Sequence, residues 1–109
     1  MAQTDRDVDI AKNIQTIEWL KADIVSSLGA LFRAMLKGTE DIIIDSLAGI
    51  IVVSYILGRR LGVHFARVDV QVEKKVRKNI DEGHEVEKRY GDLSALVRYL
   101  EDRREGIRG

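Results

Sequence analysis

The sequence predicts an all-α fold, a bundle of four to five helices that assembles as an oligomer. Proline is absent from the 109 residues, and apolar residues recur at three- and four-residue intervals between glycine-containing turns. With 45% hydrophobic and 33% charged residues, the chain is typical of one globular domain with its own core, and a disordered segment is a poor fit. Because cysteine is also absent, a disulfide-stapled fold is set aside.

The first helix is expected from about residue 7 to residue 36. Its apolar positions step by threes and fours and are Ile10, Ile14, Ile17, Leu20, Ile24, Leu28, Leu31 and Met35. Gly38 suits the position just after a helix end, and Thr39 with the acids that follow is typical of a helix start. A tight turn at residues 37–39 is therefore predicted between two antiparallel helices.

The second helix is predicted to end at Arg59 and Arg60, with Gly62 beyond them. Its β-branched residues would also suit a strand, but its length, its end signals and its spacing favour a helix. The helix is apolar on nearly all sides, so it is either central in a bundle or faces another subunit. A chain this short has few residues to surround such a helix, and we expect a homodimer or a dimer of dimers.

Neither a membrane nor a nucleic acid is expected as a partner. The most apolar stretch, residues 42–57, contains Asp45 and two serines and is shorter than the roughly 20 residues that span a bilayer. Eighteen basic and eighteen acidic residues give a formal net charge of zero, which provides no bulk attraction to polyanions. The first ten residues are polar and acidic, unlike a signal peptide, so a cytoplasmic location is expected.

The rest of the chain predicts two further helices in a single domain. Valine or isoleucine recurs every four residues from Val68 to Ile80, which indicates an exposed amphipathic helix that breaks near Gly83. Asp92 is expected to cap a short last helix before the charged end of the chain frays. The predicted organisation is a flexible N-terminus at residues 1–8, one helical domain at residues 9–104 and a flexible tail at residues 105–109.

The stretch LGALFRAMLKGTEDIIIDSLAGIIVVSYILGRRLGV, residues 28–63, resembles the core helical hairpin of MazG-like proteins in the all-α NTP pyrophosphohydrolase superfamily. The resemblance lies in the order of its parts: an apolar helix ending in Leu-Lys-Gly, an acidic cap, a second apolar helix and then Arg-Arg-Leu-Gly. The flanking segments extend the resemblance from residue 10 to about residue 100. It implies a helical bundle of MazG-like type.

Catalytic members of that superfamily carry Glu-x-x-Glu on the first helix and Glu-x-x-Asp on the second, and these four carboxylates bind Mg²⁺. Residues three apart share a helix face, and Mg²⁺ prefers oxygen ligands. Aligned on the Lys-Gly turn, this chain has Ser27 and Ala30 at the first pair of positions and Ser46 and Gly49 at the second. All four carboxylates are missing, so the resemblance implies a degenerate metal site where small residues let the helices pack closely.

Two acids remain near these positions. Asp41 and Asp45 stand four apart and are candidates for holding a displaced cation, although Asp41 also suits the first turn of a helix. Asp45 interrupts an apolar helix, where an unpaired charge is costly, and Arg33 is its expected partner.

Lys75 and Asn79 stand four apart on the third predicted helix, where family members carry residues that can contact nucleotide. Lysine offers a phosphate a point charge, and asparagine can donate and accept hydrogen bonds. Alternating charges are also typical of a solvated helix face, which leaves both interpretations open. His64 and His84 lack the paired spacing of a zinc site.

Two functions follow from these observations. The first is a non-catalytic MazG-like protein that binds a nucleotide or acts as an oligomeric interaction protein and needs no cofactor. The second is a nucleoside triphosphate pyrophosphohydrolase, which releases the monophosphate and pyrophosphate with Mg²⁺ at a rearranged site. The missing carboxylates favour the first. The expected partners are further copies of the chain and a nucleotide.

Overall fold

The computed structural model describes residues 2–108, and within them the chain forms five helices and no strand. The predicted all-α class is confirmed. The helices are α1 (Ala2–Lys37), α2 (Glu40–Arg60), α3 (Phe65–Asp81), α4 (Glu85–Tyr90) and α5 (Asp92–Arg108). The chain divides into two compact units, residues 1–65 and 66–109, and each is described by itself below.

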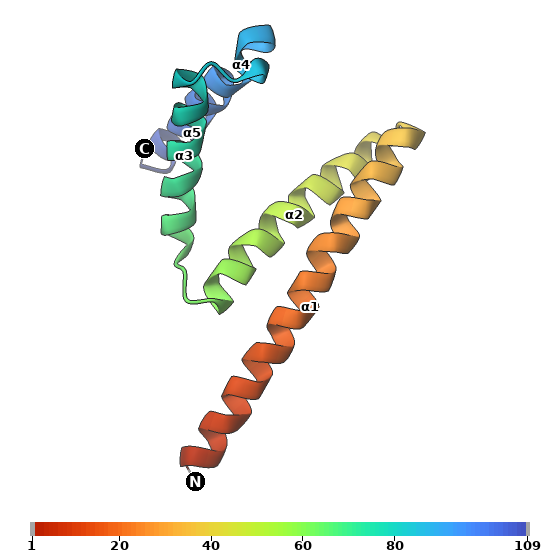
Figure 1. Ribbon diagram of the computed structural model, residues 1–109, viewed down its shortest axis with the longest axis vertical. Helices are drawn as coiled ribbons and strands as arrows, with labels where there is room; N and C mark the ends of the chain where they lie inside the picture. Colours follow the sequence, from red (N-terminus) through yellow and green to blue (C-terminus); the bar gives the residue numbers. More distant parts are fainter. Residues whose placement is uncertain (1, 109) are drawn as a thin grey trace. The chain divides into compact units, whose positions relative to one another are not determined.

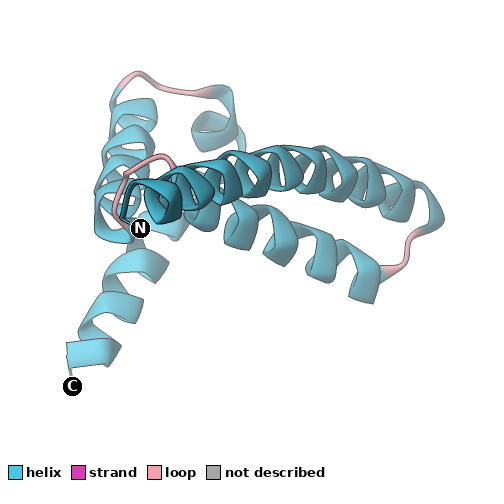
Figure 2. Ribbon diagram, turned by 90° about the horizontal axis from the view of Figure 1, so that it is seen from below, coloured by secondary structure: helices cyan, strands magenta, loops and turns pink. Residues whose placement is uncertain are grey.

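The first unit is a hairpin of α1 and α2, which run side by side in both views (Figures 1 and 2). The turn between them falls at residues 38–39, where Gly38 has φ 69° and the Thr39 N–H donates to the Ala34 carbonyl at 3.2 Å. Thr39 occupies the N-cap position, but its side chain makes no capping hydrogen bond. The predicted turn is confirmed, because glycine adopts this left-handed conformation without steric cost.

The two helices of the hairpin differ in length, with 36 residues in α1 and 21 in α2. The Asn13 side-chain amide donates to the Arg60 carbonyl at 3.2 Å, so the end of α2 lies beside Asn13. The N-terminal residues of α1 therefore extend past α2, as Figure 1 shows.

The predicted mobility of residues 1–8 and 105–109 stays a prediction, and residues 1 and 109 lie outside the described part of the chain.

Burial within the hairpin is sparse. Ala34 is the one hydrophobic residue of this unit that is buried among the side chains described, and Ser46 is buried at 5% exposure. Helix α2 ends at Arg60, with Gly62 beyond it at φ 87°, as the sequence predicted. By length and composition alone α2 could also cross a membrane. Core helices of soluble proteins pass the same test but are mostly buried, whereas little of α2 is buried in this structure. The whole helix is longer than the apolar stretch of residues 42–57 that the sequence analysis considered.

The second unit contains α3, α4 and α5. Helix α3 buries Val76, and the chain leaves it at Gly83, which has φ 69°. Helix α4 begins after His84, whose Nδ1 accepts a hydrogen bond from the Val86 N–H at 3.1 Å. The break expected near Gly83 is thus followed by a six-residue helix that ends at Gly91 in the left-handed conformation.

Helix α5 starts at the predicted residue but differs in its cap and its length. The carboxylate of Glu87 accepts from the Ser94 N–H at 2.9 Å and from the Ser94 hydroxyl at 2.6 Å, so Glu87 supplies the cap that was assigned to Asp92. The helix continues to Arg108 where the sequence predicted a short helix and a frayed end.

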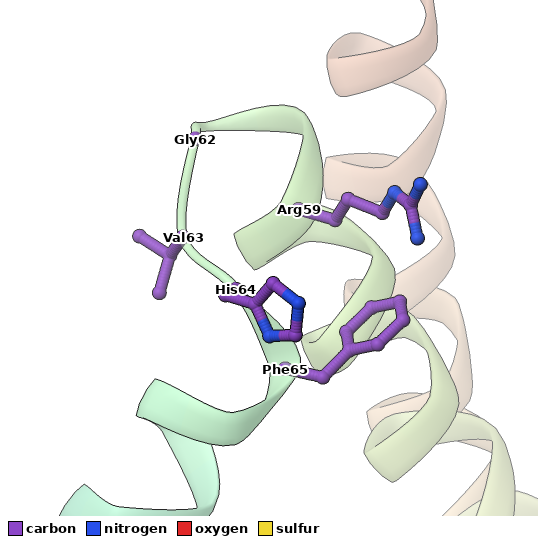
Figure 3. Close-up of a pocket in the computed structure, with 5 residues that line it drawn as sticks. All are labelled: Arg59, Gly62, Val63, His64 and Phe65. Atoms are coloured by element: carbon purple, nitrogen blue, oxygen red, sulfur yellow. The ribbon is translucent and has the colours of Figure 1, made fainter.

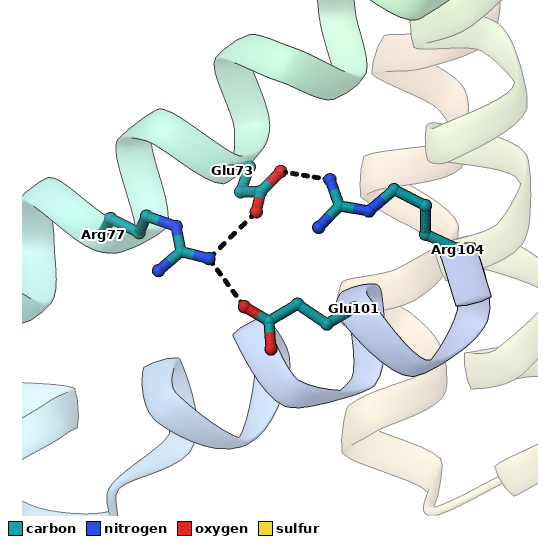
Figure 4. A network of polar contacts seen from close by, with 4 residues as sticks. All are labelled: Glu73, Arg77, Glu101 and Arg104. Carbon is teal, nitrogen blue, oxygen red and sulfur yellow. Dashed lines mark hydrogen bonds and ion pairs between the residues drawn. The ribbon is translucent and has the colours of Figure 1, made fainter.

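The longer α5 carries ion pairs to α3 at Glu101 and Arg104. Arg77 Nη2 lies 2.7 Å from a Glu101 oxygen and 3.0 Å from a Glu73 oxygen, and Arg104 lies 3.1 Å from Glu73 (Figure 4). The hydrogen bond from Arg77 is the largest cause that lowers the pKa of the Glu73 carboxyl, and Arg104 adds to it. The charged residues expected to fray therefore join two helices.

Candidate functional site

An open pocket of about 500 Å³ lies between α1 and α2. Its lining residues are small or β-branched, apart from one aspartate, and are Ser26, Ser27, Ala30, Asp45, Ser46, Ala48, Gly49, Val52 and Val53. All four positions that the resemblance aligns with metal-binding carboxylates, Ser27, Ala30, Ser46 and Gly49, belong to this lining. The structure thus brings the two pairs together across the hairpin.

Ser27 and Gly49 face each other directly. The Ser27 Oγ lies 3.4 Å from the position that a Cβ on Gly49 would occupy, which is an ordinary van der Waals contact. Ala30 stands three residues after Ser27 on α1, and Ser46 stands three before Gly49 on α2, so each pair shares a helix face. A methyl group at position 49 would therefore fit between the two helices at their present separation.

The pocket offers hydroxyl groups from its serines and one carboxylate, that of Asp45. Among the residues that the structure describes, no group of three or more His, Cys, Asp and Glu side chains is arranged to hold a metal ion. Mg²⁺ is normally held by carboxylates together with waters and substrate phosphates. The side chains of this pocket fit Mg²⁺ poorly.

The two remaining acids are both exposed. Asp41 lies in the first turn of α2, where a negative charge interacts favourably with the helix dipole. No ion pair joins Asp45 to Arg33 in the described chain, and the Arg33 guanidinium instead folds back toward Gly29 of its own helix. The expected Arg33 partner is therefore wrong, because an exposed carboxylate is hydrated and needs no cation to offset burial.

Lys75 and Asn79 lie on α3, in the second unit, so they are described apart from the pocket. The Lys75 side chain is exposed, and Asn79 is half-buried with its backbone carbonyl accepting from the His84 N–H at 2.9 Å. Contact of either residue with a nucleotide stays a prediction.

The opposite flank of the hairpin carries a group of exposed apolar side chains, of which Leu28 and Met35 belong to the apolar row predicted for the first helix. We call it the apolar face, and it consists of Val25, Leu28, Phe32, Met35, Ile44, Leu47 and Ile51, exposed by between 44% and 70%. At 100° per residue, these positions on α1 and α2 point away from the pocket flank. The signal in the sequence was the three-four spacing from residue 25 to residue 35, offset by one position from the buried row that includes Ala34.

The chain is an all-α protein whose first unit is a two-helix hairpin. The pocket of this hairpin is lined by two pairs of facing positions, and the positions of each pair stand three residues apart. The model of the MazG-like family matches residues 10–93, and the chain belongs to the MazG-like family. Comparison with curated proteins gives no match. Comparison with solved structures gives none either.

Proposed function

We propose that this chain is a non-catalytic MazG-like protein whose hairpin serves self-association rather than metal-dependent hydrolysis. The observation that supports this proposal most strongly is the composition of the pocket between α1 and α2. Positions Ser27, Ala30, Ser46 and Gly49 line that one pocket and supply no carboxylate. A triphosphate with its Mg²⁺ would meet two hydroxyls, a methyl group and a bare backbone there.

The chemistry of phosphoryl transfer supports the proposal. Cleavage of a nucleoside triphosphate needs positive charge on the phosphates and an oriented water, and a carboxylate-bound metal ion supplies both. Asp45 alone stands at the edge of the pocket, and Asp41 is not among its lining residues. One exposed carboxylate is a weak anchor for a strongly hydrated cation.

Pyrophosphate release tests this proposal. Purified protein is incubated with Mg²⁺ or Mn²⁺ and a panel of canonical and damaged nucleoside triphosphates, and we expect no release above the metal-only background. An Asp41→Asn, Asp45→Asn double variant is the matched control, since any contaminating enzyme would act equally in both preparations. Release at an enzymatic rate by the parent that the double variant loses would establish a rearranged active site.

The apolar face supports the self-association part of the proposal. The first unit buries only Ala34 among its described hydrophobic side chains, too little for a stable two-helix hairpin alone. Large side chains such as Leu28 at 44% exposure and Phe32 at 55% stand on the surface instead. A second hairpin with the same face is self-complementary across a twofold axis, and covering these groups would contribute about 25 cal/mol for each Å² buried.

Light scattering with size-exclusion chromatography measures the assembly. The chain has a mass of 12.3 kDa, and we expect two or four copies in the parent protein. Leu28→Glu places a charge in the apolar face and is expected to shift the mass toward the monomer. Trp19→Glu is the matched control, because Trp19 lies on the same helix, is 60% exposed and stands nine residues before Leu28, which places it on the opposite side of α1 from the face. A monomeric parent, or a protein that leaves the membrane fraction only with detergent, would contradict the proposal.

A further inference from the structure

A second pocket lies at the turn that joins α2 to α3, within the first unit. It has a volume of about 290 Å³ and is lined by Arg59, Gly62, Val63, His64 and Phe65. Figure 3 shows the side chains of Arg59, His64 and Phe65 on the same side of the turn. The lining combines a cation, an imidazole and an aromatic ring, and none of the lining residues is acidic.

The Arg59 guanidinium is held in place by a ring rather than by an acid. Its central carbon lies 5.3 Å from the centroid of the Phe65 ring, in a cation–π contact. The Phe65 ring is itself packed by Tyr55, edge to face at 5.9 Å. No ion pair of the described residues involves Arg59, so its N–H groups, which lie at the edge of the guanidinium plane, can donate to an external acceptor.

The backbone of the turn fixes the shape of this pocket. The Gly62 N–H donates to the Arg59 carbonyl at 3.1 Å, and the Val63 N–H donates to the Gly58 carbonyl at 2.8 Å. Gly62 has φ 87°, and a Cβ at this position would meet open space. The His64 ring lies 6.0 Å from the Phe65 ring and brings a nitrogen-bearing group to the same side.

From these observations we infer that the α2–α3 turn binds a small phosphate-bearing anion, with the Arg59 guanidinium as its principal contact. A guanidinium can donate hydrogen bonds to two phosphate oxygens at once. The conformational entropy that the arginine side chain loses on binding is small where an aromatic ring already holds it in place. The volume falls at the lower end of the range for small-molecule pockets, which suits a single phosphate group with a small substituent. This site is separate from the pocket between α1 and α2 and does not depend on the function proposed for that pocket.

A titration followed by NMR tests the inference. Inorganic phosphate is added to the full-length, ¹⁵N-labelled protein at constant ionic strength, and the backbone amides of residues 62–65 are followed. We expect saturable shifts at these amides. Arg59→Ala is expected to weaken binding about tenfold or more, as for loss of a hydrogen-bonded charge. Arg60→Ala is the matched control, because Arg60 carries the same charge at the next position and does not line the pocket. This substitution should change the affinity less than about twofold.

A second variant keeps the test decisive if Arg59→Ala perturbs the fold. Arg59→Lys retains the charge but loses the planar pair of donors, and we expect binding about fivefold weaker than in the parent. Helicity by circular dichroism verifies that each variant is folded. The inference is overturned if the parent shows no saturable shifts, if Arg59→Ala and Arg60→Ala weaken binding equally, or if Arg59→Lys binds as tightly as the parent.

Discussion

Four positions of the hairpin, which the resemblance aligns with the carboxylates of catalytic superfamily members, carry small uncharged side chains. Ser27, Ala30, Ser46 and Gly49 line one pocket, and none of them is charged. The sequence predicts these positions by aligning the Lys-Gly turn and by the rule that residues three apart share a face, and their match to the carboxylate positions stays a prediction. Sequence could not show that Asp45 is exposed, since that depends on which flank of α2 packs against α1.

Glycine substitutions test the packing at this pocket. Gly49→Ala is expected to raise the free energy of unfolding by about 1 kcal/mol, because Gly49 lies inside a helix and the new methyl group meets Ser27 Oγ at an ordinary contact distance of 3.4 Å. Urea unfolding at a fixed protein concentration measures the change.

Gly38→Ala is the matched control for that experiment. It is expected to lower the free energy of unfolding by about 1 kcal/mol, since Gly38 has φ 69° and nothing within 4 Å of an added Cβ. The two substitutions should have opposite signs. A loss of stability in Gly49→Ala would mean that the helices cannot accommodate a methyl group between them.

Among the helices, the sequence predicted those ends that are determined by residues close to them in the chain, such as a glycine just after the helix. Gly38 and Gly62 mark the ends of α1 and α2 in the structure as in the sequence. The features that the sequence missed are contacts between different helices: the Glu87 side chain caps α5 from α4, and Glu101 and Arg104 of α5 form ion pairs with α3. No local pattern encodes such contacts.

The ion pairs between α3 and α5 predict a pH dependence. Because the hydrogen bonds from Arg77 and Arg104 lower the pKa of Glu73, its stabilising contribution is fully present above the ordinary glutamate value of about 4.3 and is lost as the pH falls through the lower folded-state value. Glu73→Gln should be less stable than the parent at neutral pH, and the difference should vanish in acid.

Unfolding by urea at a series of pH values measures this difference. Glu105→Gln is the control, because Glu105 lies on α5 near the ion pairs, is exposed and makes no ion pair within the described part of the chain. The contribution is expected to be small, since both arginines are about half exposed. A difference between Glu73→Gln and the parent that persists unchanged below pH 3 would contradict the assignment.

For the whole molecule, composition predicted the all-α class but not what covers its apolar surface. In a chain that is 45% hydrophobic, the buried residues among the described hydrophobic side chains are Ala34, Val76 and Val97. The remaining large side chains on the apolar face account for the self-association that we propose. Neither periodicity nor a single copy of the chain shows the partner, because an apolar row has the same spacing whether it faces its own chain or another.

The central claim is that the pocket of this MazG-like protein has lost its metal-binding groups, and Mg²⁺ binding tests it most directly. Isothermal calorimetry compares the parent with a variant that restores the carboxylate pattern: Ser27→Glu, Ala30→Glu, Ser46→Glu and Gly49→Asp. We expect no Mg²⁺ binding to the parent at millimolar concentration, and a one-site isotherm with Mg²⁺-dependent thermal stabilisation in the variant. Saturable binding of Mg²⁺ to the parent at this hairpin would contradict the claim.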